Sequence, residues 1–501
     1  MVEAGKDTRL LLIVSFLTVS LFAVSNLPWT LDDYDQAKQA FVSYQMIGQQ
    51  RWLYQTTPAE GKEARGGRHS SYHISAKPPA VAWVSAALYA VTRSWDFAWL
   101  FPSFLAALGL AFLIFRAARA FGDLPALIAV AAFGLNLLSV RLATLVRTDM
   151  PLALVNFAVG LLMFEKIRTR IPWTARDRVI LFVLLTAAMF IKGPIVWAFV
   201  LPPLVLYQLR RRWRPDFPGG WSGWIPWVAS FAIFCLWVIF GIRFIEGFYE
   251  DVVLNEFAAR FHEGIHRSQP LLFYIPHLLQ KFAPWSLLII GFLVVALRKT
   301  KTTTGTWFAK LSPEMFWLIA WAVGGIAVMS LIPSKRVDRI FPAIPPLCLL
   351  LAAQIGAMTA AGDSTRIRRI ALFAVVFSAI LTGAYSAMRV IDGYRNDRDA
   401  LVKFGREVRR IAAAEHLRIE VLPARDEGLL LYLRRPRFFT LNFNGELYAG
   451  DRGFDGLVVP LDEEPWESNK SQYRLTVEKR ATLRPAMGFW HRRLTDRLDF
   501  R

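Results

Sequence analysis

The chain has 501 residues, a formal net charge of +20 and 54% hydrophobic residues. A soluble protein has about 45–50% apolar residues and interrupts its apolar runs often. Here the lysines and arginines stand in short clusters between long apolar stretches, which argues against a nucleic-acid-binding protein and is typical of membrane-spanning helices. The two cysteines, Cys235 and Cys348, lie inside apolar stretches, so neither a disulfide framework nor a zinc site is predicted.

From the N-terminus on, the hydropathy pattern predicts an all-α polytopic membrane bundle of about 11–13 transmembrane helices over residues 1–390, at roughly 17–25 residues per crossing. The apolar spans behind this prediction are 10–28, 97–115, 123–141, 150–165, 178–192, 194–209, 224–243, 276–297, 314–333, 340–361 and 367–388. The first span resembles a signal peptide, but no small-residue cleavage site follows it, so we interpret it as a retained helix. The stretch 78–93 is short and begins with two prolines, and we expect it to lie in the membrane interface.

The loops that are rich in Lys and Arg predict the orientation in the membrane. Basic clusters fall on alternate loops, at 116–119, 166–178, 210–214, 298–301 and 366–369. They lie on the same side as the N-terminus, which is therefore predicted to be cytoplasmic. The outer side then receives the segments 29–96, 142–149, 193, 244–275 and 334–339.

Near residue 390 the charged residues become dense and the apolar runs shorten. Three of these runs have the length of a strand, at Ile419–Leu422, Leu429–Leu433 and Gly456–Pro460, and turn-forming residues separate them. We therefore predict a small soluble α/β domain over residues 391–501, on the outer side of the membrane.

Several charged groups stand on the predicted outer side, where basic clusters in short loops are disfavoured. They are Lys77, Arg147 with Asp149, Lys192, Arg260 to Arg267, and Lys335 to Arg339. Arg and Lys pair strongly with phosphate through charge-assisted hydrogen bonds. The clusters predict a site for an anionic group at the outer leaflet, although any single member could instead pair with a headgroup or a neighbouring side chain.

Carboxylates form the second half of this pattern. Asp32, Asp33 and Asp35 follow the first span, and Asp149 stands directly before a Met-Pro pair at the mouth of a later span. An Asp at such a place is typical of a helix N-cap, and three acids close together could be a solvated turn. An exposed carboxylate is also what acid–base chemistry on a sugar hydroxyl requires. The residues by themselves predict an integral membrane protein that handles an anionic lipid or phosphate ligand.

The outer segments also carry a series of short motifs. In chain order these are Asp35-Gln-Ala-Lys38, Lys77-Pro78-Pro79, Arg147-Thr148-Asp149-Met150, Lys192-Gly193-Pro194, Asn255 to Arg260 with Gln269-Pro270 and Phe273-Tyr274, and Ser334-Lys335-Arg336 with Arg339. Their order resembles that in the aminoarabinose transferases and protein O-mannosyltransferases, which are glycosyltransferases of the polytopic C superfamily. The resemblance covers residues 10 to 360.

This resemblance implies the inverting transfer of a sugar from a polyprenyl (undecaprenyl) phosphate donor to an acceptor, at the periplasmic face of a bacterial inner membrane. It makes Asp35 the general base and Asp149 the second acid, which orients the acceptor or supports the site. The cations would hold the donor phosphate and stabilise its charge as it leaves. They are Lys38, Lys77, Lys192, Arg260, Lys335, Arg336 and Arg339.

The chain departs from the family before the Lys-Pro-Pro motif, where Ala76 replaces the usual glutamate, a residue with which a metal is associated. Four histidines of the outer segments could ligate a divalent metal, but such residues are more often surface histidines. They are His69, His73, His262 and His266. A metal therefore stays open, and no other cofactor is predicted.

Two other classes of protein compete with a single-sugar transferase. A flippase or transporter for a lipid-linked anionic substrate would show paired halves and charges at mid-membrane, and neither is evident in the sequence. An oligosaccharide ligase shares the architecture but transfers a whole glycan. The acceptor, whether lipid A or another lipid, a glycan or a protein hydroxyl, is not encoded in any motif of the chain.

Overall fold

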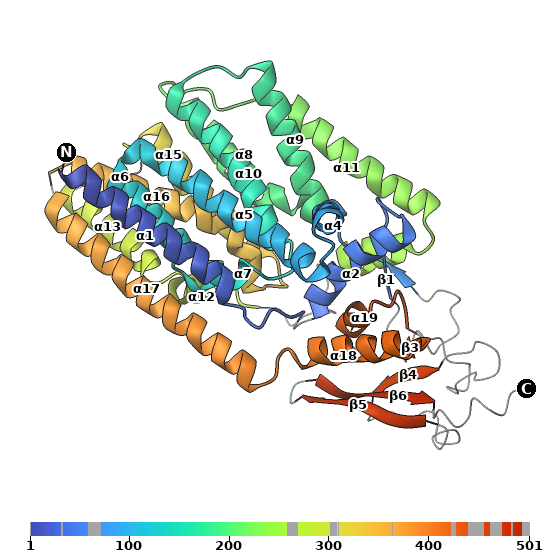
Figure 1. The fold of residues 1–501 in the computed structure, drawn as a ribbon. Helices are drawn as coiled ribbons and strands as arrows, with labels where there is room; N and C mark the ends of the chain where they lie inside the picture. The colour runs from blue at the N-terminus through green and yellow to red at the C-terminus, as the bar shows by residue number, and fades with distance from the viewer. Residues whose placement is uncertain are drawn as a thin grey trace, which may run out of the picture. The chain divides into compact units, whose positions relative to one another are not determined.

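In the computed structural model the chain divides into two compact units (Figure 1). Unit 1 comprises residues 1–26 and 94–388, and unit 2 comprises residues 27–93 and 389–501. The segment 29–96, which we assigned to the membrane module, thus falls almost wholly in the same unit as the C-terminal residues. The structure describes residues 2–31, 34–58, 72–257, 269–300, 308, 310–362, 364–421, 427–438, 455–460, 473–481 and 484–492.

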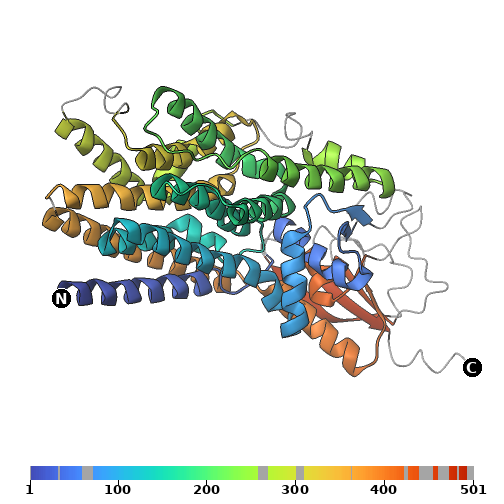
Figure 2. The ribbon, with the colours of Figure 1, turned by 90° about the horizontal axis from the view of Figure 1, so that it is seen from above.

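Unit 1 is built from helices that run alongside one another (Figures 1 and 2). In chain order they are α1 (Val2–Val24), α5 (Trp95–Ala118), η1 (Arg119–Phe121), α6 (Asp123–Gly134), α7 (Leu137–Leu142), α8 (Asp149–Thr169), α9 (Ala175–Lys192), η2 (Gly193–Val196), α10 (Trp197–Trp213), α11 (Ile225–Phe244), η3 (Tyr249–Phe257), α12 (Tyr274–Lys281), α13 (Trp285–Thr300), α15 (Pro313–Leu331), η5 (Val337–Ala343), α16 (Ile344–Ala360) and α17 (Ser364–Arg395). The last helix, α17, continues into unit 2.

Seven helical segments of the described chain are long and apolar enough to cross a membrane. They are Trp95–Phe121, Asp149–Thr169, Ala175–Trp213, Ile225–Phe244, Pro313–Leu331, Val337–Ala360 and Ser364–Arg395. Helices α12 and α13, which meet at 103°, would together form an eighth. The chain is therefore a mostly helical polytopic membrane protein, as its hydropathy predicted.

The number of candidate spans is smaller than the predicted 11–13, for two structural reasons. The predicted spans 178–192 and 194–209 form one helical run, Ala175–Trp213, which passes through the 3-10 turn η2. Two further predicted spans form shorter apolar helices, Thr8–Val24 and Asp123–Gly134. Thr8–Val24 is the apolar part of α1, which has 23 residues in all. Asp123–Gly134 has 12 residues and falls short of the roughly 20 that a crossing needs.

Glycines set the spacing between the central helices of unit 1. A Cβ atom at Gly325 on α15 would lie 2.2 Å from Phe199 on α10. A Cβ atom at Gly160 on α8 would lie 2.1 Å from Trp321, whose ring stacks on Phe157. Small residues allow helices to approach closely where no hydrophobic effect drives their association. Helix α15 is therefore held against both α8 and α10.

Unit 2 combines the segment after α1 with the C-terminal part of the chain. Its elements are α2 (Tyr34–Gln49), β1 (Thr56–Pro58), β2 (Tyr72–Ile74), α4 (Ala80–Thr92), the end of α17, α18 (Ala400–Ala414), β3 (Ile419–Val421), α19 (Glu427–Leu433), β4 (Gly456–Pro460), β5 (Tyr473–Ala481) and β6 (Arg484–Arg492). Helix α4 has 13 residues, a length of about 20 Å at 1.5 Å per residue. It is too short to cross a hydrocarbon core of about 30 Å.

The C-terminal strands form a mixed sheet in the order β3-β4-β6-β5. Strand β3 pairs with β4 in parallel, and the other two pairings are antiparallel. The predicted strands at Ile419–Leu422 and Gly456–Pro460 are thus confirmed as β3 and β4. The third predicted strand, Leu429–Leu433, is wrong because this run forms helix α19. A short apolar run does not reveal its period, and leucine favours a helix.

Candidate functional site

An ion pair between Asp149 and Lys192 joins two neighbouring helices of unit 1. Asp149 is the first residue of α8 and Lys192 the last residue of α9. The Asp149 carboxylate is buried and accepts a hydrogen bond from the Lys192 ammonium group. The predicted N-cap role of Asp149 is wrong, because Thr148 is the cap residue and the carboxylate of Asp149 faces Lys192.

Polar side chains from α5 and from the turn after α1 hold the segment that leads into α8. The Ser103 hydroxyl on α5 donates to the backbone carbonyls of Leu145 and Arg147, at 2.6 Å and 3.2 Å. The Asn26 amide donates to the Thr144 hydroxyl at 2.7 Å. Hydrogen bonds of this kind between helices fix the backbone in apolar surroundings. The segment thus brings Arg147 to the mouth of α8.

Asp338 in η5 connects this segment with the last predicted motif. Its carboxylate accepts a hydrogen bond from Arg147 at 2.6 Å and lies 3.2 Å from the Arg336 guanidinium group. Asp338 also interacts electrostatically with Lys192, so the two ion pairs belong to one cluster. Sequence reasoning did not select Asp338 as a site residue, although it lies inside the motif of Lys335 to Arg339.

Lys335 and Arg339 take a different kind of partner. The buried Lys335 ammonium group donates to the Gln269 carbonyl at 2.9 Å. The Arg339 guanidinium group donates to the carbonyl and hydroxyl oxygens of Ser334, at 2.6 Å and 3.3 Å. Within the described residues, neither cation has a carboxylate within ion-pair distance. Arg339 also interacts electrostatically with Asp338 and Asp149, and an anionic ligand beside the two cations would further offset the cost of burying them.

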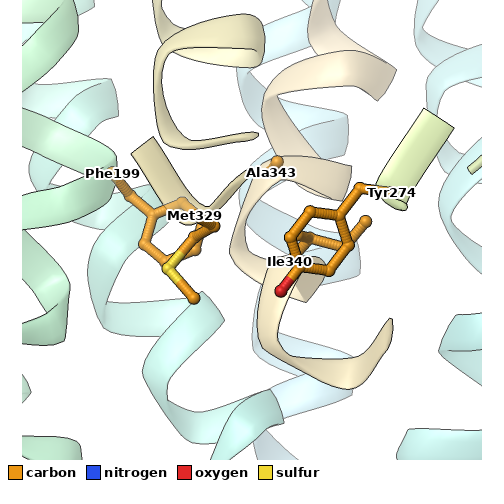
Figure 3. Packing of buried hydrophobic residues seen from close by; sticks show 5 residues of the cluster. All are labelled: Phe199, Tyr274, Met329, Ile340 and Ala343. Carbon is orange, nitrogen blue, oxygen red and sulfur yellow. The ribbon is translucent and has the colours of Figure 1, made fainter. Parts of the chain in front are cut away.

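A buried apolar cluster borders these cations. It contains Phe199 on α10, Tyr274 on α12, Met329 on α15, and Ile340 and Ala343 on η5 (Figure 3). Ile340 directly follows Arg339 along the chain, and the Arg339 guanidinium group interacts electrostatically with Tyr274. Charged and apolar groups therefore adjoin one another at this end of unit 1.

The basic residues that were predicted to be cytoplasmic lie at the other end of α8. Lys166 and Arg168 stand in its last turn, and Lys166 forms an ion pair at 2.5 Å with Asp177. A helix rises 1.5 Å per residue, so that end is about 25 Å from Asp149. The cluster around Asp149 and the Lys166 cluster thus occupy opposite ends of one helix.

In unit 2, three polar residues share one face of α2, and two of them, Asp35 and Lys38, were predicted site residues. Asp35 stands in the first turn, where the helix dipole favours a negative charge, and Lys38 and Gln39 follow three and four residues later. Gln39 is 2% exposed, and neither atom of its amide has a hydrogen-bond partner in the described chain. Sequence reasoning missed Gln39, although its spacing from Asp35 was visible.

Lys77 is held between the β1–β2 hairpin and α4, also in unit 2. Its backbone N–H donates to the Ser75 hydroxyl at 3.3 Å, and the Ser75 N–H donates to the Gln55 carbonyl at 2.8 Å. Helix α4, which begins three residues after Lys77, packs on α2 through a buried cluster. That cluster consists of Val42, Met46, Ala82 and Ala86.

The C-terminal segment supports α2 on both sides of Asp35. The Leu31 backbone N–H donates to the Tyr432 hydroxyl at 2.8 Å, and the Gln45 amide donates to the Pro436 carbonyl at 2.5 Å. Helix α19 in turn packs on α18 so closely that a Cβ atom at Gly405 would lie 2.6 Å from Tyr432 Cβ. These contacts attach the chain to the C-terminal segment just before α2, at Leu31, and near the end of α2, at Gln45.

Burial raises the pKa of Tyr44 on α2, although the nearby Arg434 and Arg435 lower it. Tyr44 therefore stays neutral at physiological pH.

The predicted site residues fall into two sets. Unit 1 brings together Asp149, Lys192, Lys335, Arg336 and Arg339. Asp35, Lys38 and Lys77 belong to unit 2. Arg260, Asp32 and Asp33 lie outside the described residues, and so do His69, His262 and His266.

The sequence did not decide whether the protein holds a metal ion. Among the described residues, no three His, Cys, Asp or Glu side chains lie close enough together to hold a metal ion. His73 in β2 is the one histidine of the four considered that the structure describes.

Comparison with known families supports the resemblance of the outer motifs. Residues 76–240 match the family model of the dolichyl-phosphate-mannose-protein mannosyltransferases. The undecaprenyl phosphate-alpha-4-amino-4-deoxy-L-arabinose arabinosyl transferase of Pectobacterium atrosepticum is 30% identical over 134 residues, 26% of this chain and 22% of that protein. The enzyme of the same name from Aeromonas salmonicida is 34% identical over 100 residues, 20% of this chain and 16% of that protein. The chain thus matches about a fifth of the length of these relatives.

Solved structures share the fold over almost the whole chain. ArnT from Cupriavidus metallidurans bound to undecaprenyl phosphate superposes with a TM-score of 0.66 and 17% identity, over 95% of this chain and 97% of ArnT. Its apo state superposes with a TM-score of 0.63 and 19% identity, over 96% and 98%. The chain therefore has the fold of ArnT. Over part of its length its sequence is similar to the arabinosyl transferases and to the mannosyltransferase family model.

Proposed function

We propose that this chain, a relative of the ArnT and mannosyltransferase families, transfers a sugar from a polyprenyl-phosphate carrier to a hydroxyl acceptor. The observation that carries the proposal is the pair of cations in unit 1, Lys335 and Arg339, which bind neutral oxygens beside a buried apolar cluster. A phosphate attached to an apolar chain has the two properties that such surroundings favour. Undecaprenyl phosphate, which the names of the matched relatives contain, is a ligand of this type.

The reaction would need one base and several cations. The acceptor oxygen attacks the anomeric carbon of the sugar, the bond from that carbon to the phosphate oxygen breaks, and the configuration inverts. Asp35 is assigned as the base that takes the acceptor proton. The polyprenyl phosphate leaves with an added negative charge, which cations stabilise. Lys38, Lys77, Lys192, Arg260, Lys335, Arg336 and Arg339 are assigned to the phosphate.

Asp149 is assigned a supporting role. Its carboxylate is already paired with the Lys192 ammonium group. It would hold the Lys192 ammonium group in place for the phosphate. Asp338 would do the same for Arg147 and Arg336, with which it forms ion pairs.

The proposed location is a bacterial inner membrane, with the N-terminus in the cytoplasm and residues 391–501 in the periplasm. The position of Asp149 and Lys166 at opposite ends of α8 supports this orientation, because basic residues at helix ends favour the cytoplasmic side. The acceptor is a lipid, a glycan or a protein hydroxyl, with lipid A as one member of the first group.

Lipid extraction from the purified chain tests the proposal. Mass spectrometry of the bound lipids should find a polyprenyl monophosphate or its single-sugar form, and Lys335→Ala with Arg339→Ala should reduce the amount that copurifies. A carrier loaded with a long glycan would indicate an oligosaccharide ligase instead. Transport of a labelled carrier across vesicles, without sugar transfer, would indicate a flippase.

A further inference from the structure

The amide of Gln39 is the most unusual buried polar group in unit 2. Gln39 is 2% exposed, yet both the nitrogen and the oxygen of its amide lack a hydrogen-bond partner in the described chain. A buried amide without partners loses its hydrogen bonds to water and gains nothing in exchange. Such a group in a folded protein calls for an explanation, and a ligand that completes its hydrogen bonds is one.

Another glutamine of the same helix shows the ordinary solution. Gln45 is 1% exposed, and its amide donates to the Pro436 carbonyl at 2.5 Å. The two residues have the same side chain, lie on the same helix and are almost equally buried, but among the described residues Gln45 has a hydrogen-bond partner and Gln39 has none. Burial alone therefore does not explain why Gln39 lacks one.

The position of Gln39 on α2 suggests what it binds. Gln39 follows Asp35 by four residues, so the two side chains share one face of the helix, with roughly 5–6 Å between their Cβ atoms. Two side chains that begin at this separation can converge on neighbouring hydroxyl groups of one sugar ring. An amide can both donate to and accept from such hydroxyls, and a lysine or arginine can only donate.

We infer that the Gln39 amide binds a hydroxyl group of the sugar substrate next to the hydroxyl that reacts. The inference rests on the proposed function, because it takes Asp35 as the base. The hydroxyl could belong to the transferred sugar or to a sugar acceptor, and both present the same chemistry to the amide. Gln39 is then a substrate-binding residue whose hydrogen bonds are completed only in the complex.

If Gln39 binds the substrate, substituting it should weaken substrate binding without lowering the stability of the protein. Replacing Gln39 with leucine removes an unsatisfied buried amide and keeps a similar volume, so the melting temperature should stay the same or rise. The same substitution removes a hydrogen bond to the substrate, which should weaken its binding about three- to tenfold. Gln45→Leu is the matched control, because it removes a satisfied amide and should lower the melting temperature.

The experiment uses the full chain in lipid nanodiscs, with undecaprenyl phosphate and undecaprenyl phosphate-mannose as probes. If Gln39 binds the transferred sugar, Gln39→Leu weakens binding of the mannose-loaded carrier and leaves the bare carrier unaffected. If it binds the acceptor, both carriers bind normally and the KM for the acceptors in a membrane lipid extract rises.

Two results would overturn the inference. One is a Gln39→Leu protein that binds both carriers and turns over acceptors like the unmodified chain. The other is a fall in melting temperature as large as that of Gln45→Leu, which would mean that Gln39 has a structural partner. A wild-type chain that binds neither carrier would instead contradict the proposed function.

Discussion

The two units hold their charged residues in different ways. In unit 1 the side chains of Asp149 and Asp338 are paired with cations that come from other segments of the bundle. In unit 2 the contacts that fix Asp35 run through the backbone at Leu31 and the side chains of Gln45 and Tyr432. The first arrangement stabilises charge, and the second sets the position of one helix.

The largest effect on stability is expected for Asp338→Asn. The substitution removes the negative charge that pairs with Arg147 and Arg336, which are both partly buried. Loss of one partner from a buried ion pair costs about 3 kcal/mol or more. The free energy of unfolding should fall by this amount in a denaturant titration. Asp216→Asn is the control, because Asp216 pairs with Arg214 at an exposed site and should leave stability unchanged.

The next effect concerns the affinity for the carrier. Lys335→Ala combined with Arg339→Ala removes two cations that are bound only to neutral oxygens. Hydrogen bonds to a charged group are worth about 1.5–3 kcal/mol each, so loss of both cations should raise the Kd for undecaprenyl phosphate by at least about 100-fold. An unchanged Kd would mean that these two cations do not bind the phosphate.

A smaller effect is expected for Tyr432→Phe, which tests the support of α2 by the C-terminal segment. The ring stays in place, but the Leu31 N–H loses its acceptor. Loss of one hydrogen bond costs about 1 kcal/mol, and hydrogen exchange at the start of α2 should become faster by about fivefold. The kcat should fall while the Kd for the carrier stays constant. If exchange in α2 is unaffected, the C-terminal segment does not position Asp35.

The sequence predicted the membrane-spanning character of the chain because apolar runs have a length that the bilayer dictates. Charges in outer loops stand out against the hydropathy pattern, which is why Lys192 and Arg339 were predicted as site residues, and both interact with Asp149 in the structure. Whether they bind phosphate stays a prediction.

Other features of the site were hidden because they depend on contacts between distant segments. The run Leu429–Leu433 in helix α19 was predicted to be a strand, because five apolar residues do not reveal a helical or a strand period. The contact between Tyr432 of this helix and Leu31, just before α2, joins residues about 400 positions apart. Asp338 lies in a predicted motif, but that motif was selected for its cations, which are the groups expected to bind phosphate. Gln39 looks like any other glutamine until its lack of partners is seen.

The most direct test of the account compares binding and transfer in one variant, Asp35→Asn. This substitution keeps the size of the side chain and removes its ability to take a proton. General-base catalysis contributes about 10²–10⁴-fold, so sugar transfer should fall by that factor while the Kd for the polyprenyl-phosphate carrier stays unchanged. Transfer at the rate of the unmodified chain would contradict the assignment of Asp35 as the base.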